Sequence, residues 1–134
     1  MPAPALITLV VGDEELLVDR AVAAVVAAVR ESEPEVDVHD LVPAQVGLST
    51  LVEVTSPSLF GDRRVVVLRS SQDLTKDLAA TVIDYLGNPA DDVNLVLTHA
   101  GGAKGKAVLE AATKAKAQRV DCRGPKKGPE RVAF

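Results

Sequence analysis

ALITLVV, residues 5–11, is an unbroken apolar run of strand length, and Gly12 ends it. Two comparable runs follow later in the chain, RVVVL at 64–68 and VNLVLT at 93–98. Strands that are apolar at nearly every position are typical of a parallel sheet covered by helices on both faces, because neither face meets water. These three runs therefore predict the centre of such a sheet.

Two further segments predict the outer strands. EVDVHDL, residues 35–41, alternates apolar and polar side chains as an edge strand does, and RVDC at 119–122 suits a short last strand. Helical patterns alternate with the strands, at residues 14–30, 48–54, 75–86 and 104–117. This alternation predicts a three-layer α/β fold with a mainly parallel five-stranded sheet and right-handed crossovers.

The first predicted helix, 14–30, has a pronounced apolar pattern. Asp13 precedes it and is expected to cap it, because a short polar side chain can accept hydrogen bonds from the first backbone N–H groups. The apolar residues that recur at helical spacing are expected to form its buried stripe, namely Leu16, Leu17, Ala21, Ala24, Val25 and Ala28.

Length and composition fit one domain. The chain has 134 residues, of which 47% are hydrophobic, and this is enough for one packed core. We assign residues 1–123 to that domain. GPKKGP at 124–129 is typical of a linker, so residues 124–134 are expected to be a linker and the start of a following helical domain that this chain lacks.

Several classes of protein are excluded by bulk features. No apolar run reaches the roughly 18 residues that span a bilayer, and no basic region precedes the first run as in a secretory signal. The single Cys122 cannot form an internal disulfide, which fits a reducing cytoplasm. One cysteine and two histidines offer no zinc-ligand spacing. We therefore expect a cytoplasmic protein with no membrane contact and no bound metal.

The net charge of −4 is unevenly distributed. The first hundred residues hold 16 acidic and 6 basic side chains, whereas residues 101–134 hold 9 basic and 3 acidic ones. Such a basic segment can contact DNA phosphates. Because no aromatic side chain is interleaved to stack on bases, a solvated helix followed by a basic linker is the simpler interpretation.

One segment superficially resembles a phosphate-binding loop, GGAKGKA at 101–107. The loop pattern requires glycine where this chain has Ala100, and serine or threonine where it has Ala107. Two required positions fail, so no ATP site is expected here. Gly101 and Gly102 are more simply a flexible turn.

Two acidic segments are further candidate sites. In GDEE at 12–15, three carboxylates crowd the start of a helix and would repel a phosphate there. Asp91 and Asp92 precede a strand, whereas α/β sites form beyond the ends of strands, so a solvated turn is favoured over a magnesium site. No nucleophile and base can be paired with specificity. The residues predict a binding protein without a cofactor.

Leu59 and Phe60 stand side by side in PSLFG, residues 57–61, just before the strand at 64–68. Phe60 is one of two Phe residues in a chain with one Tyr and no Trp. The pair could fold back as a lid on the core, which the general burial of apolar residues favours. The pair could instead be an exposed anchor for a partner.

Three motifs occur in a familiar order and spacing: Gly12-Asp13-Glu14 with Leu16-Leu17, PSLFG before RVVVL, and Lys104-Gly105-Lys106-Ala107 at the start of a late helix. Together they resemble the N-terminal domain of the delta subunit of the bacterial DNA polymerase III clamp loader. The resemblance covers essentially the whole chain, and PSLFG is its most specific part. It implies an AAA+-like fold, related to P-loop NTPases, without a working nucleotide site.

The resemblance also implies a function. Leu59 and Phe60, with Ser58 and Gly61 beside them, would bind a hydrophobic pocket on the sliding clamp (the beta subunit), and the domain would help to open that ring during DNA replication. The domain itself would be non-catalytic, although the family's holoenzyme is a DNA-directed DNA polymerase. Other clamp-loader subunits would be contacted through domains missing here, and DNA only weakly.

The residues leave two alternative functions open. One is a degenerate P-loop nucleotide hydrolase. The other is a weak DNA-binding domain that uses the basic residues 101–134.

Overall fold

The computed structural model describes residues 5–56 and 62–122 of the chain. Within these ranges one sheet has five strands, β1 (Ile7–Val11), β2 (Asp37–Leu41), β3 (Arg64–Leu68), β4 (Val93–His99) and β5 (Gln118–Asp121). Their order across the sheet is β2-β3-β4-β1-β5, and every neighbouring pair is parallel. The predicted α/β fold with a five-stranded sheet is confirmed, with EVDVHDL at an edge.

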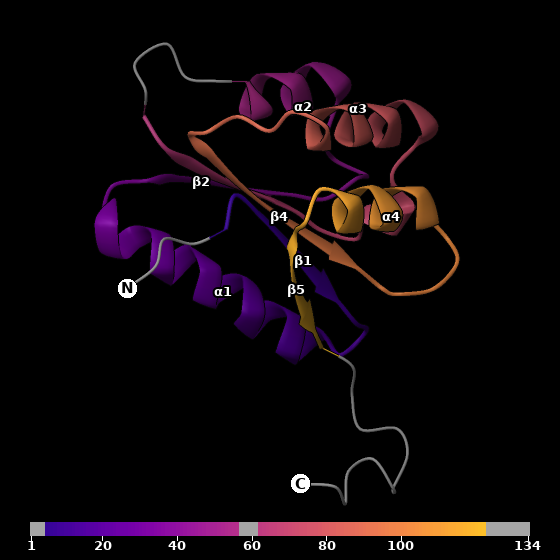
Figure 1. Ribbon diagram of the computed structural model, residues 1–134, viewed down its shortest axis with the longest axis horizontal. Coiled ribbons are helices and arrows are strands. Elements are labelled where there is room, and N and C mark those ends of the chain that lie inside the picture. The colour runs from indigo at the N-terminus through magenta and orange to yellow at the C-terminus, as the bar shows by residue number, and fades with distance from the viewer. Residues whose placement is uncertain (1–4, 57–61, 123–134) are drawn as a thin grey trace, which may run out of the picture.

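In the described part of the chain, four α-helices cover the sheet, α1 (Glu15–Ser32), α2 (Leu48–Thr55), α3 (Lys76–Leu86) and α4 (Lys106–Lys114). Figure 1 shows α1 below the sheet and the other three above it. The path of the chain explains this division. The connection through α1 crosses the sheet from β1 to β2, whereas those through α2, α3 and α4 run in the opposite direction, so crossovers of one hand place them on opposite faces.

The alternation of side chains along each strand divides the core into two clusters. Leu9, Val66, Leu95 and Leu97 belong to the cluster that includes residues of α2, α3 and α4. Val10, Val65, Val67 and Val96 belong to the cluster that includes residues of α1. All seven residues of β4 are buried, as expected for a central strand covered on both faces.

The buried face of α1 differs in part from the prediction, since of the predicted residues Ala21 and Val25 do pack, partly buried, against the core. Val18, Val22 and Val29 are the buried residues of this helix, whereas Leu16 is 57% exposed, Leu17 is 36% exposed and Ala24 is also exposed. Nearly every side of the helix carries Ala, Val or Leu, so periodicity alone could not select the face that packs. The stripe of β-branched valines, spaced by four and seven residues, is the face that meets the sheet.

The predicted cap of α1 is also wrong. Glu14, not Asp13, occupies the N-cap position, and its side chain makes no capping hydrogen bond. By contrast, the Thr75 side chain caps α3 by accepting a hydrogen bond from the Leu78 N–H at 3.3 Å. The start of α1 is held instead by backbone hydrogen bonds from the preceding turn to the sheet, which are described below.

The last predicted helix is shorter than expected. Residues 104–117 were predicted to be helical, but α4 begins at Lys106 because Gly105 before it has a left-handed conformation, with φ of 70°. Lys116, with φ of 64°, lies in the turn before β5. A short 3₁₀ helix, η1 (Ser71–Asp73), follows β3 and was not predicted.

Two further observations bear on the sequence expectations. Cys122, directly after β5, is buried. Among the helices within residues 5–56 and 62–122, none is long and apolar enough to cross a membrane. Residues 124–134, assigned to a linker and a further domain, lie outside the described ranges.

Candidate functional site

The residues predicted to bind a partner, Ser58, Leu59, Phe60 and Gly61, lie outside the described residues. Both flanks of this segment are described. On one side α2 ends at Thr55, and on the other side β3 begins at Arg64. The candidate site is therefore the surface that surrounds these two flanks.

Arg63 fixes the flank on the β3 side. Its guanidinium donates to Asn94 Oδ1 at 2.7 Å and to the carbonyl of Asp91 at 3.1 Å. Asn94 is buried in β4, and its amide nitrogen donates in turn to the carbonyl of Ala5 at 3.0 Å. A chain of hydrogen bonds thus ties the residue just after Asp62 to the start of the central strand.

Arg64 fixes the flank on the α2 side. Its guanidinium donates to the carbonyls of Glu53 and Val54 at 3.1 and 3.2 Å. The last carbonyls of a helix have no partner within the helix and carry partial negative charge, so a guanidinium there stabilises the end of α2. The Ser56 hydroxyl also donates to the carbonyl of Val52 at 2.6 Å. Arg64, the first residue of the strand that follows residues 57–61, is therefore bonded directly to the end of the helix that precedes them.

These two arginines were not singled out from the sequence. A signal was present, since Arg63 and Arg64 stand together directly before a buried strand, in a part of the chain that is otherwise acidic. Their partners, the end of α2 and the start of β4, could not be read from sequence.

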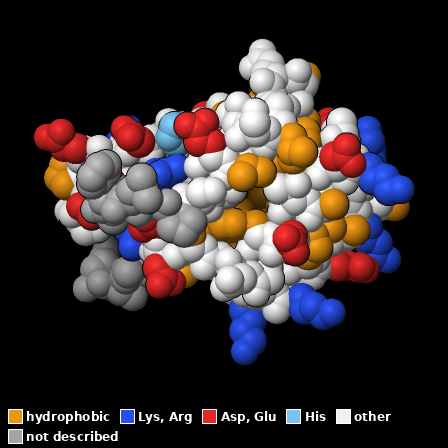
Figure 2. Space-filling model, turned by 90° about the horizontal axis from the view of Figure 1, so that it is seen from above, with side chains coloured by type: hydrophobic (Ala, Val, Ile, Leu, Met, Phe, Trp, Pro, Cys, Tyr) orange, Lys and Arg blue, Asp and Glu red, His pale blue; other side chains and the backbone are white. Residues whose placement is uncertain are grey.

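A groove with a volume of about 810 Å³ lies beside the two flanks. One wall is formed by Val52, Thr55 and Ser56 at the end of α2, and the opposite wall by Thr81, Asp84 and Tyr85 of α3, while residues 88–92 close one end. Figure 2 views the molecule from the side of α2 and α3, and hydrophobic side chains gather there around a hollow, with acidic side chains near it.

Tyr85 and Val52 give the groove apolar lining. The phenol oxygen of Tyr85 accepts a hydrogen bond from the Ala90 N–H at 3.1 Å, and burial raises the pKa of this phenol above its ordinary value. Val52 is 48% exposed, and Leu48, one turn earlier on α2, is 47% exposed. Large apolar side chains so exposed on adjacent turns mark a surface able to contact another protein.

A second hollow, of about 560 Å³, lies where ligands bind in many α/β folds, beyond the carboxyl ends of β1, β3 and β4. Arg69 lies across it. Its guanidinium pairs with Asp40 at 2.8 Å and with Asp19 at 2.6 Å, and these two carboxylates raise the pKa of the guanidinium. The one arginine that lines this hollow is therefore already occupied by two carboxylates of the chain itself.

The turn between β1 and α1 is also occupied. In phosphate-binding folds the backbone N–H groups of this turn point at the ligand. Here the Gly12 N–H donates to the His99 carbonyl at 2.9 Å, and the Glu14 N–H donates to the Cys122 carbonyl at 3.4 Å. The amides that would bind a phosphate instead hold the turn against the sheet, and Asp13 and Glu15 line the hollow with negative charge.

The loop that superficially resembles a phosphate-binding loop folds around its own chain. The imidazole Nδ1 of buried His99 accepts a hydrogen bond from the Gly101 N–H at 2.8 Å, and its Nε2 lies 3.1 Å from the Gly105 carbonyl. The Ala100 N–H donates to the side chain of Gln72 at 3.1 Å. These donors and acceptors serve the packing of the loop, which agrees with the failure of the motif at Ala100 and Ala107.

The two lysines of this loop region face acidic side chains. Lys104 pairs with Asp73 of η1 at 2.8 Å, and Lys106 lies 3.7 Å from Glu110 within α4. All four side chains are about half exposed or more, so the pairs are solvated. Two of the three basic side chains between residues 101 and 114 therefore lie beside a carboxylate of the chain itself.

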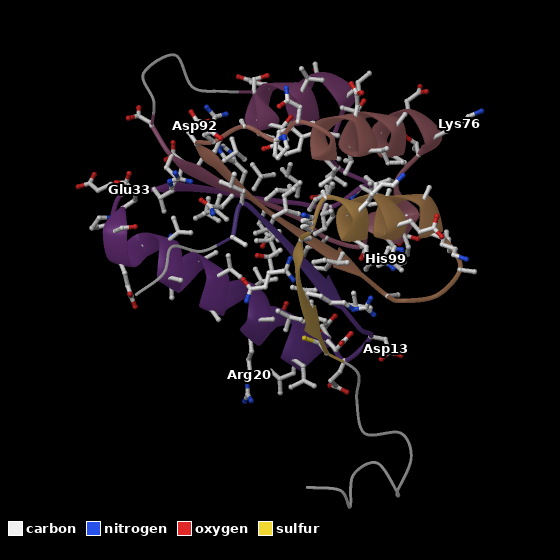
Figure 3. The ribbon with its side chains drawn as sticks, viewed as in Figure 1. Asp13, Arg20, Glu33, Lys76, Asp92 and His99 are labelled. Carbon is white, nitrogen blue, oxygen red and sulfur yellow. The ribbon has the colours of Figure 1, made fainter. Side chains whose placement is uncertain are left out.

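Asp91 and Asp92 lie at the amino end of β4, as predicted. Figure 3 shows Asp92 and Asp13 at opposite ends of the sheet, so the two acidic segments are separate. Asp91 is exposed, and its carbonyl is held by Arg63. Within the described ranges, no group of three or more His, Cys, Asp or Glu side chains is placed to hold a metal ion.

The comparisons with known proteins agree with this fold. A family model described as DNA polymerase III, delta subunit, matches residues 9–123. The sequence of the chain has no match among curated proteins.

Two solved structures share the fold. The DNA clamp loader delta protein of Bacillus subtilis has a TM-score of 0.71 at 15% identity, over 92% of this chain and 40% of its own. A DNA polymerase III gamma subunit-related protein of Thermotoga maritima has a TM-score of 0.62 at 19% identity, over 92% of this chain and 43% of its own. The chain therefore spans less than half the length of either structure.

Proposed function

The chain belongs to the DNA polymerase III delta subunit family, and on that premise we propose that it is a sliding-clamp-binding, ring-opening module of the DNA replication clamp loader. The resemblance stated from the sequence motifs is confirmed by the family match, which spans residues 9–123. The clamp-binding role, the residues that carry it and the partners belong to the proposal.

The observation that carries the proposal is the PSLFG segment between two anchored flanks. Leu59 and Phe60 are two large apolar residues, and the residues on either side are tied to the sheet and to α2 through Arg63 and Arg64. In our proposal these two side chains enter a hydrophobic pocket on the clamp, with Ser58 and Gly61 beside them. Burial of two such side chains would contribute roughly 1.5–3 kcal/mol each.

A non-catalytic role is supported by the two places where a nucleotide would bind. The amides of Gly12 and Glu14 are used within the fold, and Arg69 is paired with two carboxylates. The module would therefore act through binding energy: its affinity for the clamp would be higher when the clamp interface is open, and binding would shift the ring toward that state.

The other partners follow from the same premise. The chain covers 40% of the Bacillus subtilis clamp loader delta structure, so we propose that contacts with other loader subunits are made by parts of the family's longer proteins outside this match. DNA contact by residues 101–134 would be weak and non-specific, because scattered lysines and arginines contact only phosphates.

The test is a binding titration with the sliding clamp of the same organism. Leu59→Ala combined with Phe60→Ala should weaken binding by about thirty-fold or more, because truncation of a hot-spot anchor typically costs about 2 kcal/mol or more. The matched control is Leu16→Ala combined with Leu17→Ala, an adjacent apolar pair at the start of α1, on the opposite face of the sheet.

Three results would count against the proposal. The first is a wild-type chain with no affinity for the clamp, and the second is a Leu59 and Phe60 double variant that binds as tightly as the wild type. Unfolding of that double variant, detected by circular dichroism, would instead support the lid interpretation of the pair.

A further inference from the structure

We propose that the groove between α2 and α3 is a second contact for the clamp, receiving an apolar side chain from the clamp surface next to the pocket for Leu59 and Phe60. This inference rests on the proposed function and extends it from two residues to a defined surface. The surface consists of Leu48 and Val52 on α2 and Tyr85, Pro89 and Ala90 across the groove.

Covalent geometry links the two contacts. Ser56 lines the groove, and Leu59 is three residues further along the chain. Three residues span at most about 11 Å, since an extended chain covers roughly 3.3–3.6 Å per residue. On the other side, Arg63 binds the carbonyl of Asp91, which also lines the groove. A protein that binds Leu59 and Phe60 must therefore come close to the groove from both flanks.

The area that a stable interface buries also indicates that the clamp contacts the groove. A specific protein interface buries about 800 Å² on each partner. A single large aromatic side chain buries only about 150–250 Å², so Leu59 and Phe60 cannot supply that area alone. Val52 and Leu48 present exposed apolar surface on neighbouring turns of the helix that leads into the segment. They are the large exposed apolar side chains nearest in sequence to the pair among the described residues.

The chemistry of the groove defines its occupant. Val52, Pro89, Ala90 and the ring of Tyr85 provide apolar contacts, so the entering side chain is aliphatic or aromatic. Asp84 and Asp91 are exposed at the margin of the groove. Basic side chains are therefore expected around the entering residue on the clamp, because complementary charges favour the correct register and accelerate association.

The experiment is a clamp titration with single variants of the full chain. Val52→Asp should weaken binding about ten-fold or more, because it would place an unpaired carboxylate against an apolar side chain. Leu16→Asp makes a comparable change on an exposed helical residue of the opposite face and should leave binding unchanged. Asp84→Lys should weaken binding several-fold, and less so at high salt, because screening reduces repulsion from basic groups on the clamp.

A direct readout of the groove is available, because Tyr85 is the only tyrosine of the chain. Fluorotyrosine incorporated at this position gives one ¹⁹F resonance. Addition of the clamp should shift this resonance in the wild type, and the shift should require much more clamp in Val52→Asp. This measurement also shows whether the variant keeps the native environment of Tyr85 before the clamp is added.

The outcomes separate the two proposals. If the Leu59 and Phe60 double variant loses binding while Val52→Asp and Asp84→Lys bind normally, the groove is not a clamp contact and the proposed function stands. If none of the variants loses binding, the proposed function fails, and the groove inference fails with it. If Val52→Asp changes self-association measured by sedimentation, with clamp affinity unchanged, the occupant is a second copy and the inference is overturned.

Discussion

Gly105 lies so close to Gln72 that a Cβ atom on Gly105 would come within 2.5 Å of the Gln72 Cα. The contact joins the loop before α4 to η1, two segments more than 30 residues apart. Gly105 also has a φ of 70°, which costs other residues energy. Two independent constraints therefore require glycine at this position.

We predict that Gly105→Ala destabilises the domain by about 2 kcal/mol or more, from the sum of left-handed strain and overpacking against a backbone atom. The measurement is urea unfolding followed by circular dichroism. Gly102→Ala is the matched control, because nothing lies within 4 Å of a Cβ at Gly102. Equal stability of the two variants would contradict the close packing.

His99 holds the same loop from the sheet. Its ring accepts from Gly101 at Nδ1 and faces the Gly105 carbonyl through Nε2, which assigns the neutral form with the proton on Nε2. His99→Leu should cost roughly 2–4 kcal/mol, because two partly buried backbone groups, the Gly101 N–H and the Gly105 carbonyl, lose their partners. Hydrogen exchange should show faster exchange of the Gly101 amide in this variant. An unchanged rate would mean that the imidazole does not hold the loop.

The pKa of Tyr85 leads to a prediction at high pH. Burial raises the pKa of the phenol in the folded chain above the ordinary value of about 10. The folded state therefore binds the proton more strongly than the unfolded state. The stabilisation is complete below about pH 10 and is lost as pH rises through the folded-state pKa, so the free energy of unfolding falls in that window.

Two measurements test this prediction on the single tyrosine. The ultraviolet absorbance of the tyrosinate should appear at higher pH in the folded chain than in urea. Tyr85→Phe should remove that part of the pH dependence of unfolding, while the remaining slope reports the other groups. If the phenol titrates at the same pH in both states, the environment assigned to Tyr85 is wrong.

We predict that the chain does not bind ATP. The amides of Gly12 and Glu14 donate to carbonyls of the fold, and acidic side chains line the nearby hollow. Titration calorimetry with magnesium-ATP should give no saturable heat. Saturation at micromolar ATP would instead favour the degenerate nucleotide hydrolase that the sequence left open.

The strands could be predicted because their signal is local. Runs such as 5–11 and 93–98 are apolar at nearly every position, and only a strand covered on both faces needs that composition. The interlock of Gly105 with Gln72 could not be predicted, because it depends on how η1 and the loop before α4 meet in space. The buried face of α1 was missed for a different reason, since Ala, Val and Leu surround the helix and leave several faces equally apolar.

The candidate site likewise combines features that have a local signal in the sequence and features that depend on the fold. Leu59 and Phe60 could be proposed from sequence because a pair of large apolar residues at a predicted turn is unusual, and their role stays a prediction. The groove was not found, because Val52 belongs to α2, Tyr85 to α3 and Ala90 to the turn before β4, and only the fold brings them together. The roles of Arg63 and Arg64 likewise depend on partners distant in sequence.

The position of β2 at the edge of the sheet affects how readily copies of the protein aggregate. Within the described residues no strand pairs with its outer side, so its backbone is a template on which another chain could add a strand. Asp37 and Asp40 are exposed on this strand, and Glu33 and Glu35 precede it. Repulsion between these carboxylates on different copies opposes edge-to-edge aggregation, so they protect solubility, and Asp40 in addition pairs with Arg69 within each molecule.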